Sequence, residues 1–155
     1  SVIGKEHYEK VMSYIAIAKE EGGIILTGGK RPDHMEKGYF IEPTIIVGLT
    51  ENSRCVKEEI FGPVVTVLPF DTEEQVIDYA NDTNYGLGAT IWTNDLRRAH
   101  RVAGQIEAGI VWVNTWYLRD LRTPFGGMKQ SGIGREGGAH SFEFYCEQSN
   151  ITIKL

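Results

Sequence analysis

The sequence has only two cysteines, and it lacks the spacing that marks metal ligands. Cys55 and Cys146 lie far apart, and two thiols in an acidic chain of 155 residues do not make a disulfide framework. The four histidines are scattered, and none has a second His or Cys at helical spacing. These absences exclude a disulfide scaffold and argue against a zinc site.

Long apolar runs and an excess of positive charge are also missing. No apolar run approaches the ~20 residues needed to span a bilayer, and the first residues, SVIGKEHYEK, lack the pattern of a signal peptide. The formal net charge of -5 argues against general nucleic-acid binding, because the phosphate backbone favours clustered Lys and Arg. We therefore expect a cytoplasmic protein with neither membrane nor nucleic acid as a partner.

The composition is that of an ordinary globular domain, with 41% hydrophobic and 24% charged residues. Apolar spacing, turn residues and capping residues predict helices and strands along the whole chain. The expected helices cover His7–Glu21, Thr72–Asn81, a segment capped by Asn94 and stopped by Gly109, and Ser141–Cys146. The expected strands cover Ile24–Thr27, an irregular or edge strand at Tyr39–Val47, Val64–Phe70, Gly88–Trp92, Ile110–Asn114 and Asn150–Leu155.

The fold class that this order predicts is α/β, with a partial parallel sheet flanked by helices. From Val64 to Val113 the elements alternate β-α-β-α-β, which is typical of strands joined by right-handed crossovers. These strands are apolar on both faces, as in a sheet that helices cover on both sides. The last strand, Asn150–Leu155, has no later partner in the chain, so it needs an edge in this subunit or in a neighbour.

Three segments could carry chemistry, and each has a plain structural alternative. Gly132–Gly137 matches G-x-G-x-x-G, but it lies inside a long loop, which favours a set of tight turns over a dinucleotide loop. Glu58–Pro63 is either a polar turn with one aromatic anchor or a nucleotide contact through a carboxylate and a ring. Trp116–Arg122 follows the carboxyl end of a strand, where α/β sheets bind ligands. Its arginines could receive a carboxylate or simply form an ion pair with Asp120 or with a distant acid.

Four motifs together resemble the aldehyde dehydrogenase superfamily, in the order and spacing of its C-terminal part. They are KEEIFGPVV (57–65), NYGLGATIWT (84–93), GIVWVNT (109–115) and PFGGMKQSGIGREGG (124–138). The resemblance implies that residues 1–146 are part of a catalytic domain and that residues 147–155 are a strand used in oligomer assembly. It also implies NAD or NADP as cofactor in the whole enzyme, an aldehyde as substrate and a homo-oligomer.

The resemblance assigns roles to single residues. Glu59 corresponds to the family's acid on the nicotinamide ribose, and Phe61 to the aromatic residue against the nicotinamide ring. Phe125, with Trp116 beside it, corresponds to the lining of the substrate tunnel. Glu136 corresponds to an acid near the active site that helps to relay the proton from the general base.

Within the superfamily, the loop NTWYLRDLRTPFGG resembles that of the 2-hydroxymuconic and 2-aminomuconic semialdehyde dehydrogenases, enzymes of aromatic-compound degradation. In that group an arginine at the position of Arg119 receives the carboxylate of the substrate. Alignment through Asn114 and Pro124 selects Arg119 for this role and leaves Arg122 at the rim.

The family's nucleophile is a cysteine in a Gly-Gln-x-Cys setting, and neither Cys55 nor Cys146 has that setting. We interpret both as small buried hydrophobic residues. The expectation is therefore a fragment that is inactive by itself and binds no cofactor tightly. Its parent oxidises an aldehyde to an acid through a cysteine thioester. The alternative is a stand-alone oligomerisation module without catalysis.

Overall fold

A computed structural model describes all residues from Ser1 to Leu155, and the chain divides into two compact units. The first unit is Ser1–Thr72 and the second is Glu73–Leu155. Both units combine helices with short strands, so the α/β fold class is confirmed.

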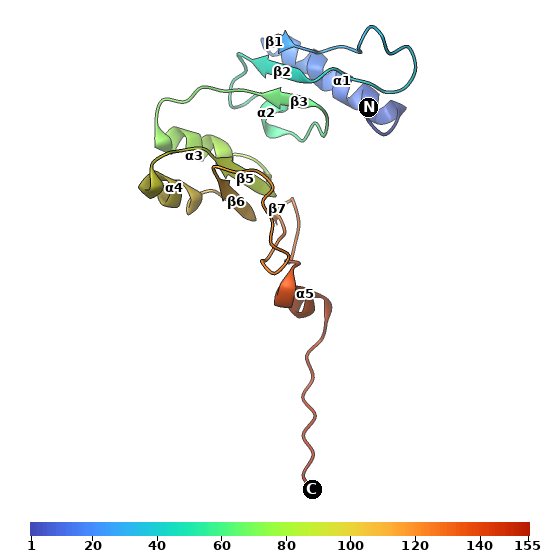
Figure 1. The fold of residues 1–155 in the computed structure, drawn as a ribbon. Coiled ribbons are helices and arrows are strands. Elements are labelled where there is room, and N and C mark those ends of the chain that lie inside the picture. Colours follow the sequence, from blue (N-terminus) through green and yellow to red (C-terminus); the bar gives the residue numbers. More distant parts are fainter. The chain divides into compact units, whose positions relative to one another are not determined.

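The first unit is a three-stranded sheet with a long helix on one face (Figure 1). Its sheet has the order β1-β2-β3, with β1 antiparallel to β2 and β2 parallel to β3. The elements are α1 (Lys5–Glu20), β1 (Ile24–Thr27), β2 (Thr44–Val47), α2 (Arg54–Lys57) and β3 (Val64–Thr66).

Helix α1 forms because its apolar residues recur at helical spacing and bury one stripe. Val11, Ile15 and Ala18 are all nearly inaccessible to solvent. The helix ends at Glu20, and the chain turns away at Gly22, whose φ of 89° lies in the left-handed region that glycine adopts without strain. The helix predicted over His7–Glu21 is thus confirmed, with ends two and one residues earlier.

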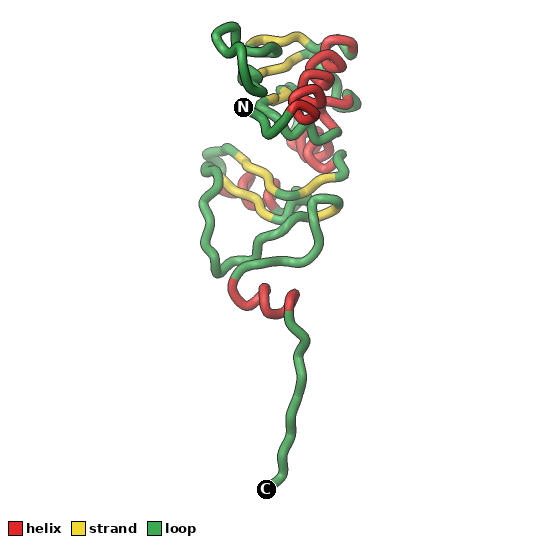
Figure 2. The backbone as a smooth tube through the Cα atoms, turned by 90° about the vertical axis from the view of Figure 1, so that its right-hand side faces the viewer, coloured by secondary structure: helices red, strands yellow, loops and turns green.

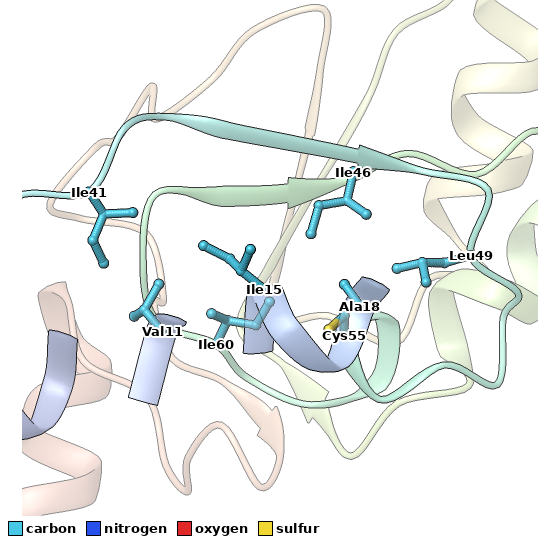
Figure 3. Packing of buried hydrophobic residues seen from close by; sticks show 8 residues of the cluster. All are labelled: Val11, Ile15, Ala18, Ile41, Ile46, Leu49, Cys55 and Ile60. Carbon is cyan, nitrogen blue, oxygen red and sulfur yellow. The ribbon is translucent and has the colours of Figure 1, made fainter. Parts of the chain in front are cut away.

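The core of the first unit lies between α1 and the sheet. Residues of α1, β2 and α2 meet there with residues of the loops beside them (Figure 3). Full burial of one Ile or Val side chain stabilises a fold by about 1.5–3 kcal/mol. The cluster consists of Val11, Ile15, Ala18, Ile41, Ile46, Leu49, Cys55 and Ile60.

The strand predicted over Tyr39–Val47 ends where expected, but it is shorter and is not an edge strand. β2 begins only at Thr44, directly after Pro43, so the proline costs the ladder no hydrogen bond. The strand then lies between β1 and β3, and Ile46 is fully buried. β3 pairs with β2 in this sheet, and it is also shorter than the predicted Val64–Phe70.

The second unit contains two small sheets. β5 and β6 are parallel neighbours with α4 packed against both, as the β-α-β pattern predicts, whereas β4 and β7 form a two-residue antiparallel pair. The elements are α3 (Glu73–Asn81), β4 (Tyr85–Gly86), β5 (Gly88–Ile91), α4 (Leu96–Ala103), β6 (Ile110–Val113), β7 (Met128–Lys129) and α5 (Gly138–Tyr145).

Both predicted ends of α4 need correction. The capping side chain is that of Asp95 rather than Asn94, and it accepts hydrogen bonds from the backbone N–H groups of Arg97 and Arg98. A carboxylate is favoured there by the positive end of the helix dipole. The helix ends at Gly104, five residues before the predicted stop at Gly109.

Most of the chain between β6 and α5 is loop (Figure 2). α5 begins three residues before the predicted Ser141, and Ser141 Oγ accepts the N–H of Gly137 at its start. Residues 147–155 are exposed and form no strand within the chain. The assembly strand therefore stays a prediction.

Every helix of the structure is too short or too polar to cross a membrane.

Candidate functional site

The segment Glu58–Pro63 in the first unit is held against α1 by close packing at Gly62. A Cβ at Gly62 would lie 2.6 Å from a methyl group of Val11, so only glycine allows this approach. Lys10 Nζ donates a hydrogen bond of 3.0 Å to the carbonyl of Glu59. The backbone is thereby held in place at Glu59 and directly after Phe61, the two predicted cofactor residues.

Phe61 has a strained backbone and a free side chain. Its φ is 56°, a left-handed conformation that non-glycine residues rarely adopt, and its side chain is 71% exposed. His7 supports this conformation, because its Nε2 lies 2.6 Å from the carbonyl oxygen of Phe61 and donates to it in the Nε2–H tautomer. Such strain is characteristic of residues held ready for a ligand.

The two adjacent acids, Glu58 and Glu59, have different roles. Glu58 receives two hydrogen bonds from Arg54, of 2.8 and 2.9 Å, and one of 2.6 Å from the hydroxyl of Tyr14. These bonds to Arg54 and Tyr14 lower the pKa of Glu58 from 4.5 to about 2. The side chain of Glu59 is exposed and has no such partner, so only Glu59 is free to bind a ligand.

The lowered pKa of Glu58 predicts a loss of stability in acid. A carboxylate with a depressed pKa contributes stability above its unfolded pKa of 4.5, and this contribution disappears as the pH falls toward about 2. The free energy of unfolding, measured in urea, should therefore fall with pH more steeply in the wild type than in Glu58→Gln. Glu59→Gln should keep the wild-type slope. Equal slopes for wild type and Glu58→Gln would contradict this prediction.

Glu59 and Phe61 lie at an open groove beside the first turns of α1. The groove has a volume of about 890 Å³. Its lining is mostly apolar, with charge supplied by a few side chains. The lining residues are Ser1, Val2, Ile3, Glu6, His7, Lys10, Glu59, Phe61, Gly62 and Pro63.

In the second unit, Trp112 holds the loop that carries Arg119. Trp112 is buried on β6, and its indole N–H donates a hydrogen bond of 2.8 Å to the carbonyl of Leu118. Its ring also lies 5.0 Å from that of Trp116 and 6.5 Å from that of Tyr117, centroid to centroid. The loop is therefore anchored one residue before Arg119.

Arg119, Phe125 and Glu136, three of the predicted site residues, meet in this unit. The guanidinium carbon of Arg119 lies 3.9 Å from the centroid of the Phe125 ring, a cation–π contact. Arg119 Nη2 lies 3.6 Å from Glu136 Oε1. Phe125 and Glu136 exchange two backbone hydrogen bonds of 2.8 Å, which fix their relative positions.

The neighbouring arginines are engaged elsewhere. Arg122 forms a two-pronged pair with Asp120, at 2.9 and 2.5 Å, and its side chain is 88% exposed. Arg135 donates to the carbonyls of Gly127 and Gly134. By contrast, the side chain of Arg119 is 27% exposed and donates no hydrogen bond. Its donors are thus shielded from most of the solvent and still free.

Two glycines of the segment Gly132–Gly137 lie too close to other parts of the chain to carry a Cβ. A Cβ at Gly134, where φ is 73°, would lie 2.2 Å from the ring of Phe144. A Cβ at Gly137 would lie 2.3 Å from the carbonyl oxygen of Thr123. These contacts favour the predicted loop of tight turns over a loop that cradles phosphate.

The two cysteines differ in exposure, so one part of their interpretation is wrong. Cys55 is buried as expected and donates to the carbonyl of Tyr14 at 3.2 Å, and burial raises the pKa of its thiol. Cys146 is exposed, because it follows α5 where the chain has no further core to pack on.

A model of the aldehyde dehydrogenase family matches residues 1–151. The chain belongs to this family. The similarity includes both candidate regions, since the match covers Glu59 and Phe61 as well as Arg119, Phe125 and Glu136.

Two similar relatives are both named as muconic semialdehyde dehydrogenases. A 2-hydroxymuconic semialdehyde dehydrogenase of Pseudomonas putida is 57% identical over 99% of this chain and 32% of its own length. A 2-aminomuconic semialdehyde dehydrogenase of Bos taurus is 50% identical over 99% of this chain and 33% of its own length. The chain therefore spans about a third of the length of the curated relatives it matches.

Solved structures of the family share the fold. An NAD+ complex of an aldehyde dehydrogenase from Bacillus cereus superimposes with a TM-score of 0.89 at 47% identity, covering 94% of this chain and 29% of that one. A betaine aldehyde dehydrogenase from Staphylococcus aureus, also with NAD+, gives a TM-score of 0.90 at 46% identity, covering 93% and 29%.

Sequence reasoning missed the residues that hold the site residues in place. His7, Lys10, Trp112 and Arg135 act on backbone carbonyls far along the chain or across a turn. A contact to a carbonyl leaves no residue-type signal at the accepting position, so no motif would have revealed it.

Proposed function

We propose that this chain works as part of an NAD-dependent aldehyde dehydrogenase that oxidises a semialdehyde with a remote carboxylate to the corresponding acid. The observation that carries the substrate class is Arg119, whose guanidinium lies over the Phe125 ring and, although it is 3.6 Å from Glu136, donates no hydrogen bond. NADP remains the alternative cofactor.

A carboxylate is the ligand that suits this arrangement. An arginine presents a planar fork of donors that matches the two oxygens of a carboxylate. The Phe125 ring excludes water from one face of the guanidinium, which strengthens its interaction with an anion. The exposed ring of Trp116 would offer a flat apolar contact to an unsaturated carbon chain.

Glu59 and Phe61 fit the nicotinamide end of a dinucleotide. The free carboxylate of Glu59 would accept hydrogen bonds from ribose hydroxyls, and the exposed Phe61 ring would contact the nicotinamide face. When bound, NAD supplies the hydride acceptor. The residues of this chain orient it, because His7 and Lys10 fix the backbone on which both side chains stand.

The cofactor proposal predicts a specific effect of Glu59→Gln in the whole enzyme. Loss of a hydrogen bond to a charged group costs about 1.5–3 kcal/mol, so the Kd for NAD should rise roughly tenfold or more. Calorimetric titration with NAD measures it. Glu6→Gln is the matched control, because Glu6 is also an exposed acid of the groove. An equal rise of the Kd for NAD in both variants would mean that the net charge of the groove, and not a specific hydrogen bond of Glu59, affects NAD binding.

Glu136 is proposed as the acid that helps to relay a proton from the general base. The nucleophilic cysteine and that base are proposed to lie outside these residues, in a longer polypeptide. The competing hypothesis is an assembly module without catalysis. Intact mass of the native protein, with the reading frame upstream of Ser1, separates the two, because only the first requires a segment that carries the cysteine.

We also propose a homo-oligomer assembled through residues 147–155, in the cytoplasm. Ile151, Ile153 and Leu155 alternate along this segment and are each at least 76% exposed, which gives an extended strand one apolar face. Deleting Asn150–Leu155 should lower the sedimentation coefficient of the native protein to that of a smaller assembly. An unchanged coefficient would remove this segment from the interface.

A further inference from the structure

Arg119 and Glu136 form an ion pair without a hydrogen bond. Their closest atoms, Nη2 and Oε1, are 3.6 Å apart, beyond the 2.7–3.2 Å range of an N–H···O bond. The pair is therefore held by charge attraction alone, and a shorter, two-pronged contact to another carboxylate would be stronger.

Both partners are fixed at their backbones, but neither is saturated. Glu136 is tied to Phe125 by two hydrogen bonds, and Arg119 lies on the ring of the same residue. Arg122 and Arg135 are engaged with Asp120 and with loop carbonyls. Arg119 is thus the one cation that faces the Glu136 carboxylate in this structure.

A substrate carboxylate that reaches Arg119 must also approach Glu136. Two like charges a few ångströms apart repel each other, and the repulsion is stronger near a protein surface than in bulk water. Glu136 would have to turn away from the guanidinium, and its side chain, 56% exposed, has solvent to turn into.

We propose that Glu136 is a placeholder for the substrate carboxylate: it pairs with Arg119 in the free enzyme and is displaced when the substrate binds. The inference rests on the proposed function. It makes Glu136 a specificity-determining residue, because it weakens the binding of every carboxylated ligand and leaves neutral ligands unaffected. It also makes the release of the Glu136 carboxylate depend on a correct substrate.

The test is a binding measurement on the whole enzyme, so that any role of Glu136 in turnover does not enter. The probe is cis,cis-muconate, an unsaturated dicarboxylate without an aldehyde, titrated by calorimetry. The neutral comparison is 2,4-hexadienamide, an unsaturated ligand without an aldehyde or a charge, titrated in the same way. The variants are Glu136→Gln, Arg119→Gln and the double variant, with Glu143→Gln as the control, an exposed acid of the same unit that pairs with His140.

A partly exposed ion pair contributes up to about 1 kcal/mol, so Glu136→Gln should tighten muconate binding by roughly two- to fivefold. The Kd for neutral 2,4-hexadienamide should not change, and the gain in muconate binding should vanish when Arg119→Gln is also present. Weaker or unchanged muconate binding in Glu136→Gln, while Arg119→Gln still weakens it, would overturn the placeholder alone. No effect of Arg119→Gln on muconate would overturn the proposed substrate class as well.

Discussion

Arg119→Ala in the whole enzyme is expected to lower kcat/KM for a carboxylated semialdehyde by about a hundredfold or more. Removing a charged hydrogen-bond partner from a desolvated site costs about 2–5 kcal/mol, and each 1.4 kcal/mol is tenfold. The side chain of Arg119 is only 27% exposed and rests on Phe125, so a carboxylate left there without it would lose both water and its counter-charge. A neutral aldehyde of similar length should lose little.

Arg122→Ala is the matched control, because it removes the same side chain from the same loop. Arg122 is 88% exposed and bound by Asp120, so its removal should change kcat/KM for either substrate by less than about fivefold, as expected for a surface pair of about 0–1 kcal/mol. Kinetics with both aldehydes measure the contrast. An equal loss for the two aldehydes in Arg119→Ala would show that Arg119 supports the loop rather than selecting the substrate.

The sequence predicts well the elements that carry their own local signal. α1 has a long apolar stripe and a glycine stop, and β5 and β6 are apolar strands on either side of a helix, so these elements are found close to where they are expected. β4 and β7 have two residues each, too few for any periodicity, and they were missed. The start of β2 was predicted too early, because a proline directly before a strand cannot be told from the sequence alone from a proline that interrupts one.

In the candidate site, too, some features could be predicted from the sequence and others depend on the tertiary fold. Glu59 and Phe61 were selected as candidates by their place in one of the four motifs, and Arg119 by a loop that resembles that of the muconic semialdehyde dehydrogenases. That Glu58 is saturated and Glu59 is free depends on Arg54 and Tyr14, and Tyr14 lies 44 residues away along the chain. The contact of Arg119 with Glu136 likewise joins two positions of the loop that only its turns bring together. Such pairings come from the tertiary fold, so local patterns do not reveal them.

The 155-residue chain by itself is expected to show no dehydrogenase activity with NAD and any aldehyde. Oxidation through a thioester needs a thiolate that a base or a cation activates. Cys55 is buried, its S–H donates to the carbonyl of Tyr14, and burial raises the pKa of its thiol, so this thiol is disfavoured as a nucleophile. Cys146 is exposed, but no side chain of the chain hydrogen-bonds to its thiol.

The assay follows NADH formation by the purified chain, after mass spectrometry has excluded a longer contaminant. Cys55→Ser and Cys146→Ser identify the source of any turnover that is found. Turnover that persists in both variants points to a contaminant or to a route without a thiol. Turnover lost only in Cys146→Ser would show that an exposed cysteine at the end of α5 serves as the nucleophile, and the nucleophile would then lie within this chain. The proposal of a longer polypeptide would lose its main reason, because the absence of a suitable thiolate is what requires it.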